Sequence, residues 1–458
     1  MGSIWIAAIL LMMMGIAYQM GTRRSRRLAT AGGSRLHSRP QYHGTLVALW
    51  AVLPVLLAAV LWMVFSDAAA RWVVNSLMPA ELVEQGGSAY TAAYRRIENI
   101  ASGFGVAGTP EDWELAAGEA LRRFDTLGYM FLIGLAALAG AGLAWRAQLR
   151  LTARTRARNQ VERVILVVLV ACSVVAILTT LGIVFSLVAE TLRFFTFISP
   201  FEFFFGTTWN PRYDTTGAGT TGSFGMLPLL WGTLSIAFIA MLVAIPIGLM
   251  TAVWLSQYAP RRVRGIVKPI IEVLAGIPTI VYGIFALVTV GPFLRDIGAA
   301  VGLSINATSA LTAGLVMGIM LIPFISSLSD DVIRQVPSAM RDGSLGLGAT
   351  KSETIRKVIL PAALPGIVGA ILLAVSRAIG ETMIVVLAAG NAPVLQFDPT
   401  QPTSAFTVAI VAALTGDSDF ASPQSLVAFA LGFTLFFMTL LLNVAALSIV
   451  RKYREQYE

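Results

Sequence analysis

One arginine and one glutamate stand inside an apolar stretch near the C-terminus, in the run Ser376-Arg377-Ala-Ile-Gly-Glu381-Thr382-Met383. A buried ion in a membrane costs several kcal/mol, roughly 2.5–3.5 for a central arginine, so it persists where it lines a cavity or forms a pair. Residues four apart share one face of a helix, so Arg377 and Glu381 are expected to point together into a helix bundle. Two interpretations stay open. The two residues form a buried pair that neutralises itself, or the guanidinium fork of Arg377 binds phosphate while the Glu381 carboxylate holds or releases the guanidinium.

A second segment of interest is polar and precedes this stretch, from Asp342 to Pro361. Three glycines that weaken helix propagation lie in its first half: Gly343, Gly346 and Gly348. Thr350-Lys-Ser-Glu353 then fits a capping box at the start of a new helix. The segment is predicted to form two short helices joined by a glycine break, projecting from the membrane as a rigid knob on which a soluble motor could push. The alternative is an ordinary cytoplasmic loop.

The composition indicates that these segments belong to a membrane protein. Of the 458 residues, 56% are hydrophobic and 13% charged, and the mean hydropathy is +0.76. Soluble domains carry about a quarter charged residues, and membrane β-barrels need alternating polarity, so both classes are excluded. We predict an all-α, polytopic membrane helix bundle. Its nine spans lie at about 4–20, 44–65, 127–145, 164–189, 227–255, 269–292, 309–328, 362–388 and 425–450.

The arginines and lysines predict the orientation of these spans. With nine spans, 24 of the 33 basic residues fall on one side and eight on the other, with Arg377 alone inside a span. Short loops rich in basic residues face the cytoplasm. We therefore expect the N-terminus outside and the C-terminus inside the cell membrane. The net charge of +8 follows from this sorting and does not indicate a nucleic-acid partner.

Other chemistries lack the residues that they need. His37 and His43 are too few for a metal site and are expected in a solvated loop, and Cys172 is the single cysteine. No phosphate-cradling Gly-x-x-x-x-Gly-Lys-Ser/Thr sequence is present, so any ATP must be bound by another chain. We predict no catalytic residue, no metal site and no cofactor on this chain, and the sequence does not support an enzyme that works alone.

Three further features leave alternatives open. Pro278 interrupts the sixth span and predicts either a hinge or a tolerated kink. Glu272 sits near the cytoplasmic surface of the same span, where a snorkelling or helix-end role is favoured over contact with a substrate. Segment 66–126, with nine carboxylates and five arginines, forms either a small extracytoplasmic helical domain or a loose acidic loop.

The segment 342–361 resembles the signature of ABC-importer permeases, which runs Glu-Ala-Ala, three residues, Gly, nine residues, Ile-any-Leu-Pro. The positions that match at the right spacing are Gly348, Leu360 and Pro361, and those that depart are Asp342, Gly343, Ser344 and Val358. Arg377 to Met383 in turn resembles the corresponding helix of phosphate-specific permeases. The stretches 272–283, 208–211, 224–228 and 232–233 also resemble that family.

The resemblance covers about 160–458 and favours the PstC type of subunit over its paralogue, the PstA type. It implies a six-span, MetI-like permease core over 160–458, with 1–159 as an N-terminal extension of three spans. It also implies that Arg377 and Glu381 take part in phosphate passage and that 342–361 couples to the ATPase. The implied partners are a PstA-type permease, a dimer of PstB-type subunits that holds ATP and Mg²⁺, and an extracytoplasmic PstS-type phosphate-binding protein. The resemblance leaves open whether the substrate is phosphate or another oxyanion.

A rival class is the ion-coupled secondary transporter, which should show membrane-embedded carboxylates and repeated halves. Glu381 is the one deep carboxylate, and such a transporter leaves 342–361 unexplained. A purely structural membrane protein would not require Arg377. Phosphate uptake that depends on a separate ATPase would separate the permease from both rivals.

Overall fold

The computed structural model describes residues 2–31, 36–85, 87–106, 108–211, 222–416 and 423–454. These residues are helical apart from loops and one short hairpin, in which Trp209–Asn210 (β1) pairs antiparallel with Ser223–Phe224 (β2). The predicted all-α membrane bundle is therefore confirmed. The chain divides into two compact units, Met1–Ile177 and Leu178–Glu458, with the division inside one long helix.

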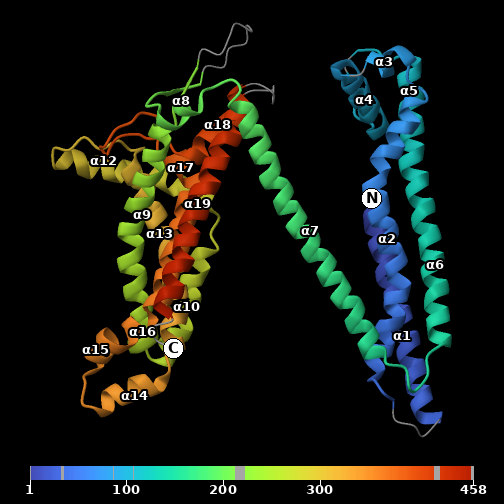
Figure 1. Cartoon of the computed structure of the whole chain (residues 1–458), viewed down its shortest axis with the longest axis horizontal. Helices are drawn as coiled ribbons and strands as arrows, with labels where there is room; N and C mark the ends of the chain where they lie inside the picture. Colours follow the sequence, from blue (N-terminus) through green and yellow to red (C-terminus); the bar gives the residue numbers. More distant parts are fainter. Residues whose placement is uncertain are drawn as a thin grey trace. The chain divides into compact units, whose positions relative to one another are not determined.

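Unit 1 is built from long apolar helices and a small group of shorter ones (Figure 1). Its helices are α1 (Gly2–Ala31), α2 (Pro40–Asn75), α3 (Ala80–Gln85), α4 (Gly87–Ser102), α5 (Asp112–Arg123), the π-helical η1 (Phe124–Gly128), α6 (Tyr129–Leu149) and the first part of α7 (Ala157–Phe194). Helices α1 and α2 approach closely because Gly21 and Gly44 lack side chains: a Cβ at Gly44 would lie 2.8 Å from the carbonyl oxygen of Tyr18.

The acidic segment 66–126 forms helices, so the helical-domain alternative is the one observed. Ile97 of α4 and Ala117 of α5 are fully buried in a shared apolar cluster. Arg96 donates two hydrogen bonds to the buried Glu114 carboxylate, at 2.8 and 3.1 Å. This fork raises the pKa of Arg96 above its usual value. Apolar packing and the ion pair thus join α4 to α5.

Unit 2 continues with α7 and contains the remaining helices. They are α8 (Pro200–Phe205), α9 (Leu227–Val253), η2 (Trp254–Tyr258), α10 (Arg261–Ala275), α11 (Thr279–Phe285), η3 (Ala286–Val290), α12 (Gly291–Ala300), α13 (Ala310–Gln335), α14 (Ser338–Gly346), α15 (Lys351–Thr354), η4 (Ile355–Ile359), α16 (Leu360–Ile379), α17 (Met383–Ala388), α18 (Phe406–Gly416) and α19 (Pro423–Arg454). In Figure 1, α14 and α15 lie at one end of this unit, and α8, α12 and α18 lie at the other.

Helix α13 is the centre of unit 2 and packs against α9 and α16. Its Gly314 and Gly318, four residues apart, let the backbone of α9 come near, since a Cβ at Gly318 would lie 2.9 Å from the carbonyl oxygen of Ala240. Small residues at this spacing are the usual device for close packing of membrane helices. The arrangement fixes α13, which carries several of the polar groups described below.

Within the described residues, eight helices are long and apolar enough to cross a membrane, and they coincide with eight of the nine predicted spans. The first predicted span, 4–20, falls in α1, where most side chains of residues 2–9 lie outside the described set. Two predicted spans are interrupted. The span at 269–292 is broken at Gly276-Ile277-Pro278, and the span at 362–388 is broken at Gly380-Glu381-Thr382.

Candidate functional site

Arg377 lies in the last turn of α16 and is exposed. Its guanidinium carbon is 5.9 Å from the centre of the Phe324 ring on α13, at the outer limit of a cation–π contact. Within the part of the chain that the structure describes, the guanidinium has no ion pair and no hydrogen bond. Its five N–H donors therefore remain open to an external acceptor.

Glu381 has a different local role from the one that its spacing predicts. Helix α16 ends at Ile379, and α17 starts at Met383, so Glu381 lies in the break between them. Its Oε1 accepts hydrogen bonds from the backbone N–H groups of Thr382 and Met383, at 3.2 and 3.1 Å. The predicted shared helix face of Arg377 and Glu381 is wrong, because α16 ends at Ile379, and the carboxylate accepts from the first N–H groups of α17 instead.

Neighbouring helices hold this break in place. Thr407 of α18 donates a hydrogen bond of 2.9 Å to the carbonyl oxygen of Glu381. One turn earlier, the Ser376 hydroxyl donates to the side-chain oxygen of Asn443 on α19, at 3.0 Å. Arg377 is thus presented from a helix end that is tied to two other helices. An arginine held in this way, without a carboxylate partner, is suited to a transient contact with an oxyanion.

The predicted knob at 342–361 is present as α14, a break, α15 and the π-helical η4. None of the residues of α14 is buried. Its apolar side chains Met340 and Leu345 are 40% and 42% exposed, and Leu347, directly after the helix, is 92% exposed. Asp342 and Gly343 lie on this exposed helix, and the Ser344 hydroxyl is 3.0 Å from that of Thr354. The helix offers an open surface, while its end is tied to α15.

The capping box predicted from Thr350 and Glu353 is confirmed. The Thr350 hydroxyl accepts from the backbone N–H of Glu353 at 3.3 Å, and the Glu353 carboxylate accepts from the backbone N–H of Thr350 at 3.0 Å. The break before it rests on Gly348, whose φ of +88° suits glycine. Gly343 and Gly346 lie within α14, so only one of the three glycines breaks the helix.

Leu360 and Pro361 begin α16, the helix that ends with Arg377. Pro361 occupies the first turn, where a missing N–H costs little. From Lys351 onward the chain is helical without a break, through α15 and η4, into the helix that carries Arg377. Pro278 stands at the start of α11, with α10 ending at Ala275, so the sixth span is broken and not merely kinked.

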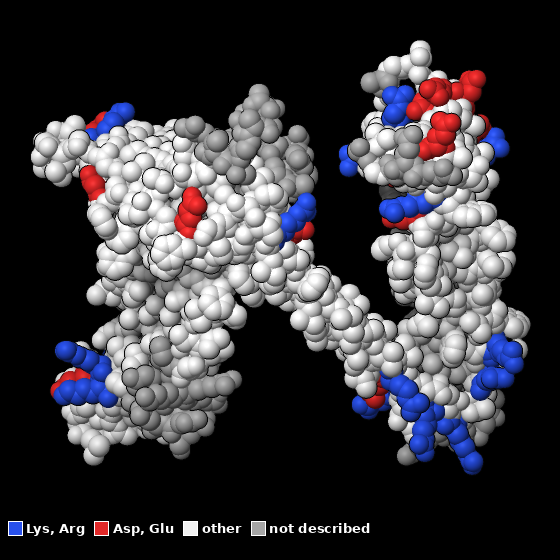
Figure 2. All heavy atoms as spheres, turned by 45° about the horizontal axis from the view of Figure 1, so that its top comes forward, with Lys and Arg blue, Asp and Glu red and all other residues white. Residues whose placement is uncertain are grey.

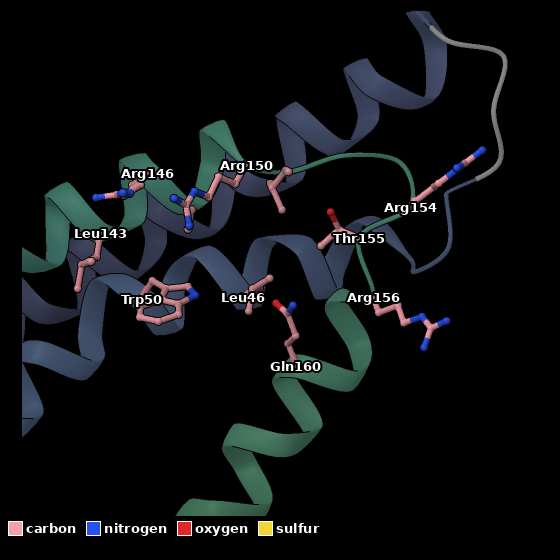
Figure 3. A pocket seen from close by; sticks show the side chains of 11 residues that line it. Leu46, Trp50, Leu143, Arg146, Arg150, Arg154, Thr155, Arg156 and Gln160 are labelled. Carbon is pink, nitrogen blue, oxygen red and sulfur yellow. The ribbon is translucent and has the colours of Figure 1, made fainter.

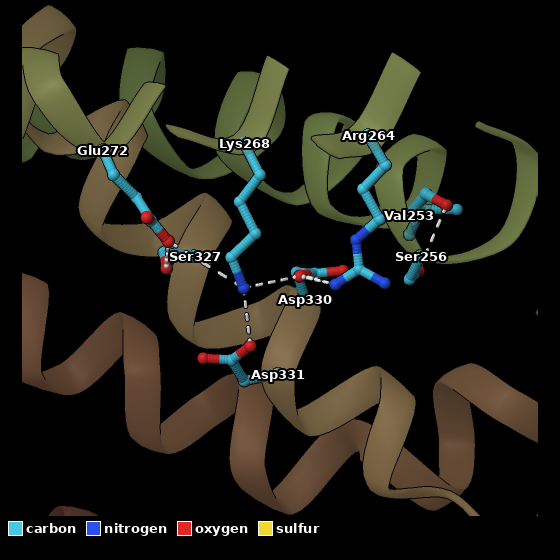
Figure 4. A network of polar contacts seen from close by, with 8 residues as sticks. All are labelled: Val253, Ser256, Arg264, Lys268, Glu272, Ser327, Asp330 and Asp331. Atoms are coloured by element: carbon cyan, nitrogen blue, oxygen red, sulfur yellow. Dashed lines mark hydrogen bonds and ion pairs between the residues drawn. The ribbon is translucent and has the colours of Figure 1, made fainter. Parts of the chain in front are cut away.

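A buried charge network joins α10 to α13, and the sequence analysis missed it (Figure 4). Asp330 is fully buried and accepts from Arg264 at 2.6 Å and from Lys268 at 2.9 Å. Lys268 also donates to Asp331 at 2.7 Å. Glu272 belongs to the rim of this network: it accepts from Ser327 at 3.3 Å, and its side chain is 49% exposed.

Burial and hydrogen bonding act in opposite directions on the pKa of Lys268 in this network. Burial alone would lower the pKa of Lys268, but hydrogen bonds to Asp331 and Asp330 outweigh it and raise that pKa above its usual value. The second oxygen of Asp330 is buried without a partner among the described residues. The sequence signal was the spacing of Arg264, Lys268 and Glu272 on one helix face, opposite an adjacent Asp pair that ends a span.

The described residues contain no group of three His, Cys, Asp or Glu side chains that could hold a metal ion. Cys172 is free and exposed on α7. The predicted solvated position of His43 is wrong: Pro40 starts α2 early, and the close contact with α1 buries His43 completely. His37, by contrast, is exposed as predicted, and its Nδ1 lies 3.3 Å from the Ser38 hydroxyl oxygen.

Two family descriptions match the chain. A family described as a phosphate ATP-binding cassette transporter matches residues 7–179, and one described as a binding-protein-dependent transport system inner membrane component matches 244–455. The probable ABC transporter permease protein YqgH of Bacillus subtilis is 31% identical over 276 residues, which cover 60% of this chain and 86% of that protein. The chain belongs to the binding-protein-dependent inner-membrane permease family.

Several other relatives carry phosphate names. The phosphate transport system permease protein PstC of Mesorhizobium japonicum is 34% identical, over 55% of this chain and 79% of that protein. PstC 1 of Mycobacterium tuberculosis is 34% identical, over 55% of this chain and 82% of that protein. A structure of the MetNI methionine ABC transporter aligns at 20% identity with a TM-score of 0.37, over 50% of this chain and 94% of that one.

The permease is thus a non-catalytic, multi-pass inner-membrane subunit of a binding-protein-dependent ABC importer. Such a subunit works with an ATPase and an extracytoplasmic binding protein. The second matching region, 244–455, contains Arg377, Glu381 and the segment 342–361. The family assignment excludes the ion-coupled secondary transporter.

Proposed function

We propose that this permease is the PstC-type subunit of an ATP-driven importer of inorganic phosphate and forms half of its translocation pathway. The observation that carries the proposal is the unpaired guanidinium of Arg377, held at the end of a membrane helix. Its planar fork matches two oxygens of a phosphate ion. The description of the family that matches 7–179 and the names of the PstC relatives support phosphate as the substrate.

In this proposal Glu381 acts on the pathway indirectly. It caps α17 and fixes the turn from which Arg377 is presented, and its negative charge near the pathway limits how long an anion stays. Pro278 opens a second break in a span, at a point where a change between inward-facing and outward-facing states would need a hinge.

The proposed contact with the ATPase is the exposed helix α14 together with the start of α16. Asp342, Gly343 and Ser344 would enter a groove on a PstB-type subunit, with Gly348 setting the angle of the next helix and Leu360 and Pro361 carrying the movement into α16. ATP and Mg²⁺ would be bound by the PstB-type dimer and not by this chain. The exposed apolar side chains of α14 are suited to such a contact.

The remaining partners are a PstA-type permease for the other half of the pathway and a PstS-type phosphate-binding protein outside the membrane. The permease core comprises 160–458, and 1–159 is an added region of three spans. The N-terminus faces outward and the C-terminus faces the cytoplasm, which brings α14 and α15 to the side of the ATPase.

Transport by a reconstituted complex tests the proposal. The permease, its partner permease, the ATPase and the binding protein are placed in proteoliposomes, and uptake of radiolabelled phosphate and sulfate is measured with and without ATP. We expect ATP-dependent uptake of phosphate and little uptake of sulfate. Equal uptake of the two anions, or uptake of phosphate without the ATPase, would contradict it.

A further inference from the structure

Unit 1 contains a basic pocket that the proposed transport function does not use. It has a volume of about 730 Å³ and lies where α2, α6 and α7 meet, at the end of the unit that carries the α6–α7 connection (Figure 3). Four arginines line it: Arg146 from α6 and Arg150, Arg154 and Arg156 from the connection. In Figure 2, blue side chains gather at this end of unit 1, and most of the red ones gather at the other end.

The connection that carries three of these arginines is firmly held. The backbone N–H of His37 donates to the carbonyl oxygen of Ala153 at 3.0 Å, and the N–H of Thr152 donates to the Thr155 hydroxyl at 2.9 Å. Leu151 and Ala157, at its two ends, are 4% and 0% exposed in the apolar cluster between the helices. The arginine backbones are therefore fixed before any ligand arrives, which lowers the entropic cost of binding one.

The charges of the four guanidinium groups are not balanced by ion pairs within the described part of the chain. None of them forms an ion pair or a side-chain hydrogen bond among the described residues. The next arginine along the chain shows the contrast, because Arg158 donates to Glu162 at 2.6 Å. Four uncompensated positive charges around one hollow favour an anion, and guanidinium groups bind the oxygens of phosphate particularly well.

The opposite wall of the pocket is apolar. It is formed by Leu46 and Trp50 of α2 and by Leu143 of α6, and Trp50 is 46% exposed. An inorganic ion makes no stabilising contact with an apolar wall, whereas a lipid can place its phosphate among the arginines and its acyl chains along the leucines. Tryptophan is enriched at the level of lipid head groups, and basic pockets between membrane helices bind anionic head groups.

We propose that this pocket binds the phosphate group of an anionic membrane lipid. In the close view Arg150 lies between α6 and Trp50 of α2, and Arg154 and Arg156 extend outward from the connection (Figure 3). The residues that line the site all belong to unit 1. The site does not depend on which anion the importer carries.

Lipid retention by the full-length protein tests the site. The protein is purified in mixed micelles with equal amounts of phosphatidylglycerol and phosphatidylcholine, and the bound lipid is identified by native mass spectrometry. Arg150→Gln is expected to weaken retention of phosphatidylglycerol about fivefold, and the triple variant Arg150→Gln, Arg154→Gln, Arg156→Gln more strongly, since each basic group near the surface contributes about 1 kcal/mol.

A control with the same change of charge is available at the other end of unit 1, in Arg71→Gln, Arg95→Gln, Arg122→Gln. This variant should retain phosphatidylglycerol like the original protein. The proposal fails if the original protein retains both lipids equally. It also fails if the variants of the pocket retain phosphatidylglycerol normally, which is the result expected of arginines that only set topology. Displacement of the lipid by millimolar inorganic phosphate would assign the pocket to the free ion and overturn the lipid site.

Discussion

The guanidinium of Arg377 lies 5.9 Å from the centre of the Phe324 ring and does not pair with Glu381, four residues later in the chain. The two charges of the motif therefore do not share one helix, because α16 ends between them. Phe324 can hold the guanidinium near α13 through its ring face while the N–H donors stay open. An arginine placed in this way can accept and release an anion without breaking a salt bridge.

The first prediction concerns this arginine. Arg377→Gln should reduce ATP-dependent phosphate uptake in proteoliposomes by more than about tenfold, because hydrogen bonds to a charged group contribute about 1.5–3 kcal/mol. Arg377→Lys should recover little, because an ammonium group lacks the planar fork. Arg163→Gln, which removes one arginine from α7, is the control and should transport normally. Near-normal uptake by Arg377→Gln would remove this residue from the pathway.

The second prediction separates the two possible roles of Glu381. If the carboxylate acts as the cap of α17, Glu381→Gln keeps an oxygen for the N–H groups of Thr382 and Met383, whereas Glu381→Ala loses it. We expect Glu381→Ala to be less stable by about 1 kcal/mol, a typical value for a lost helix cap, and to transport less than Glu381→Gln. Thermal unfolding and uptake are measured together. Equal defects in the two variants would show that the charge matters and the cap does not.

The third prediction uses two glycines of the knob. Gly348 has a φ of +88°, so Gly348→Ala should cost about 1–2 kcal/mol of local strain, and Gly348→Pro cannot adopt this φ at all. Either change should uncouple ATP hydrolysis from phosphate uptake in the reconstituted complex, while the protein still inserts into the membrane. Gly346→Ala is the matched control, because Gly346 lies within α14 and has open space around it. Normal coupling in Gly348→Pro would contradict the proposed docking role.

The fourth prediction concerns orientation. After replacement of the free Cys172 by serine, a cysteine at position 37 should react only with reagents that cross the membrane, and one at position 88 should react with impermeant reagents. The reason is the excess of arginine around position 37. Labelling of intact cells with a charged maleimide measures it. If the cysteine at 37 is labelled from outside, the N-terminal spans are oriented the other way.

Local features of the fold were predictable from the sequence, because they depend on neighbours in the chain. The capping box of Thr350 and Glu353 needs only residues three apart, and eight apolar helices follow from hydropathy. The end of α16 was missed, since the run from Arg377 to Met383 lies in an apolar stretch that reads as one helix. The residues around the break contact distant parts of the chain, since Thr407 of α18 donates to the carbonyl oxygen of Glu381 and Ser376 donates to Asn443 of α19.

Features that depend on distant parts of the chain could not be predicted in this way. Asp330 is 66 residues from Arg264 and 62 from Lys268, so nothing in the sequence pairs them until α10 packs on α13. The burial of His43 has the same origin, since it requires the close contact of α1 with α2. The resemblance to known permeases pointed to Arg377, but only the three-dimensional structure shows that no described residue pairs with its charge.

The last prediction tests the network around Asp330. This carboxylate is fully buried and accepts from both Arg264 and Lys268, whereas the side chain of Asp331, its neighbour, is 55% exposed. Asp330→Ala leaves the two cations of α10 without their buried partner, so it should lower the free energy of unfolding by about 3–5 kcal/mol. Asp331→Ala is the matched control and should cost about 0–1 kcal/mol, as for a surface pair. Thermal unfolding in detergent at low and high salt measures both. High salt should reduce the loss of stability caused by Asp331→Ala and leave the loss caused by Asp330→Ala unchanged, because solvent ions screen only accessible charges. If the two variants unfold at the same temperature, the network does not hold α10 on α13, and apolar contacts alone must do so.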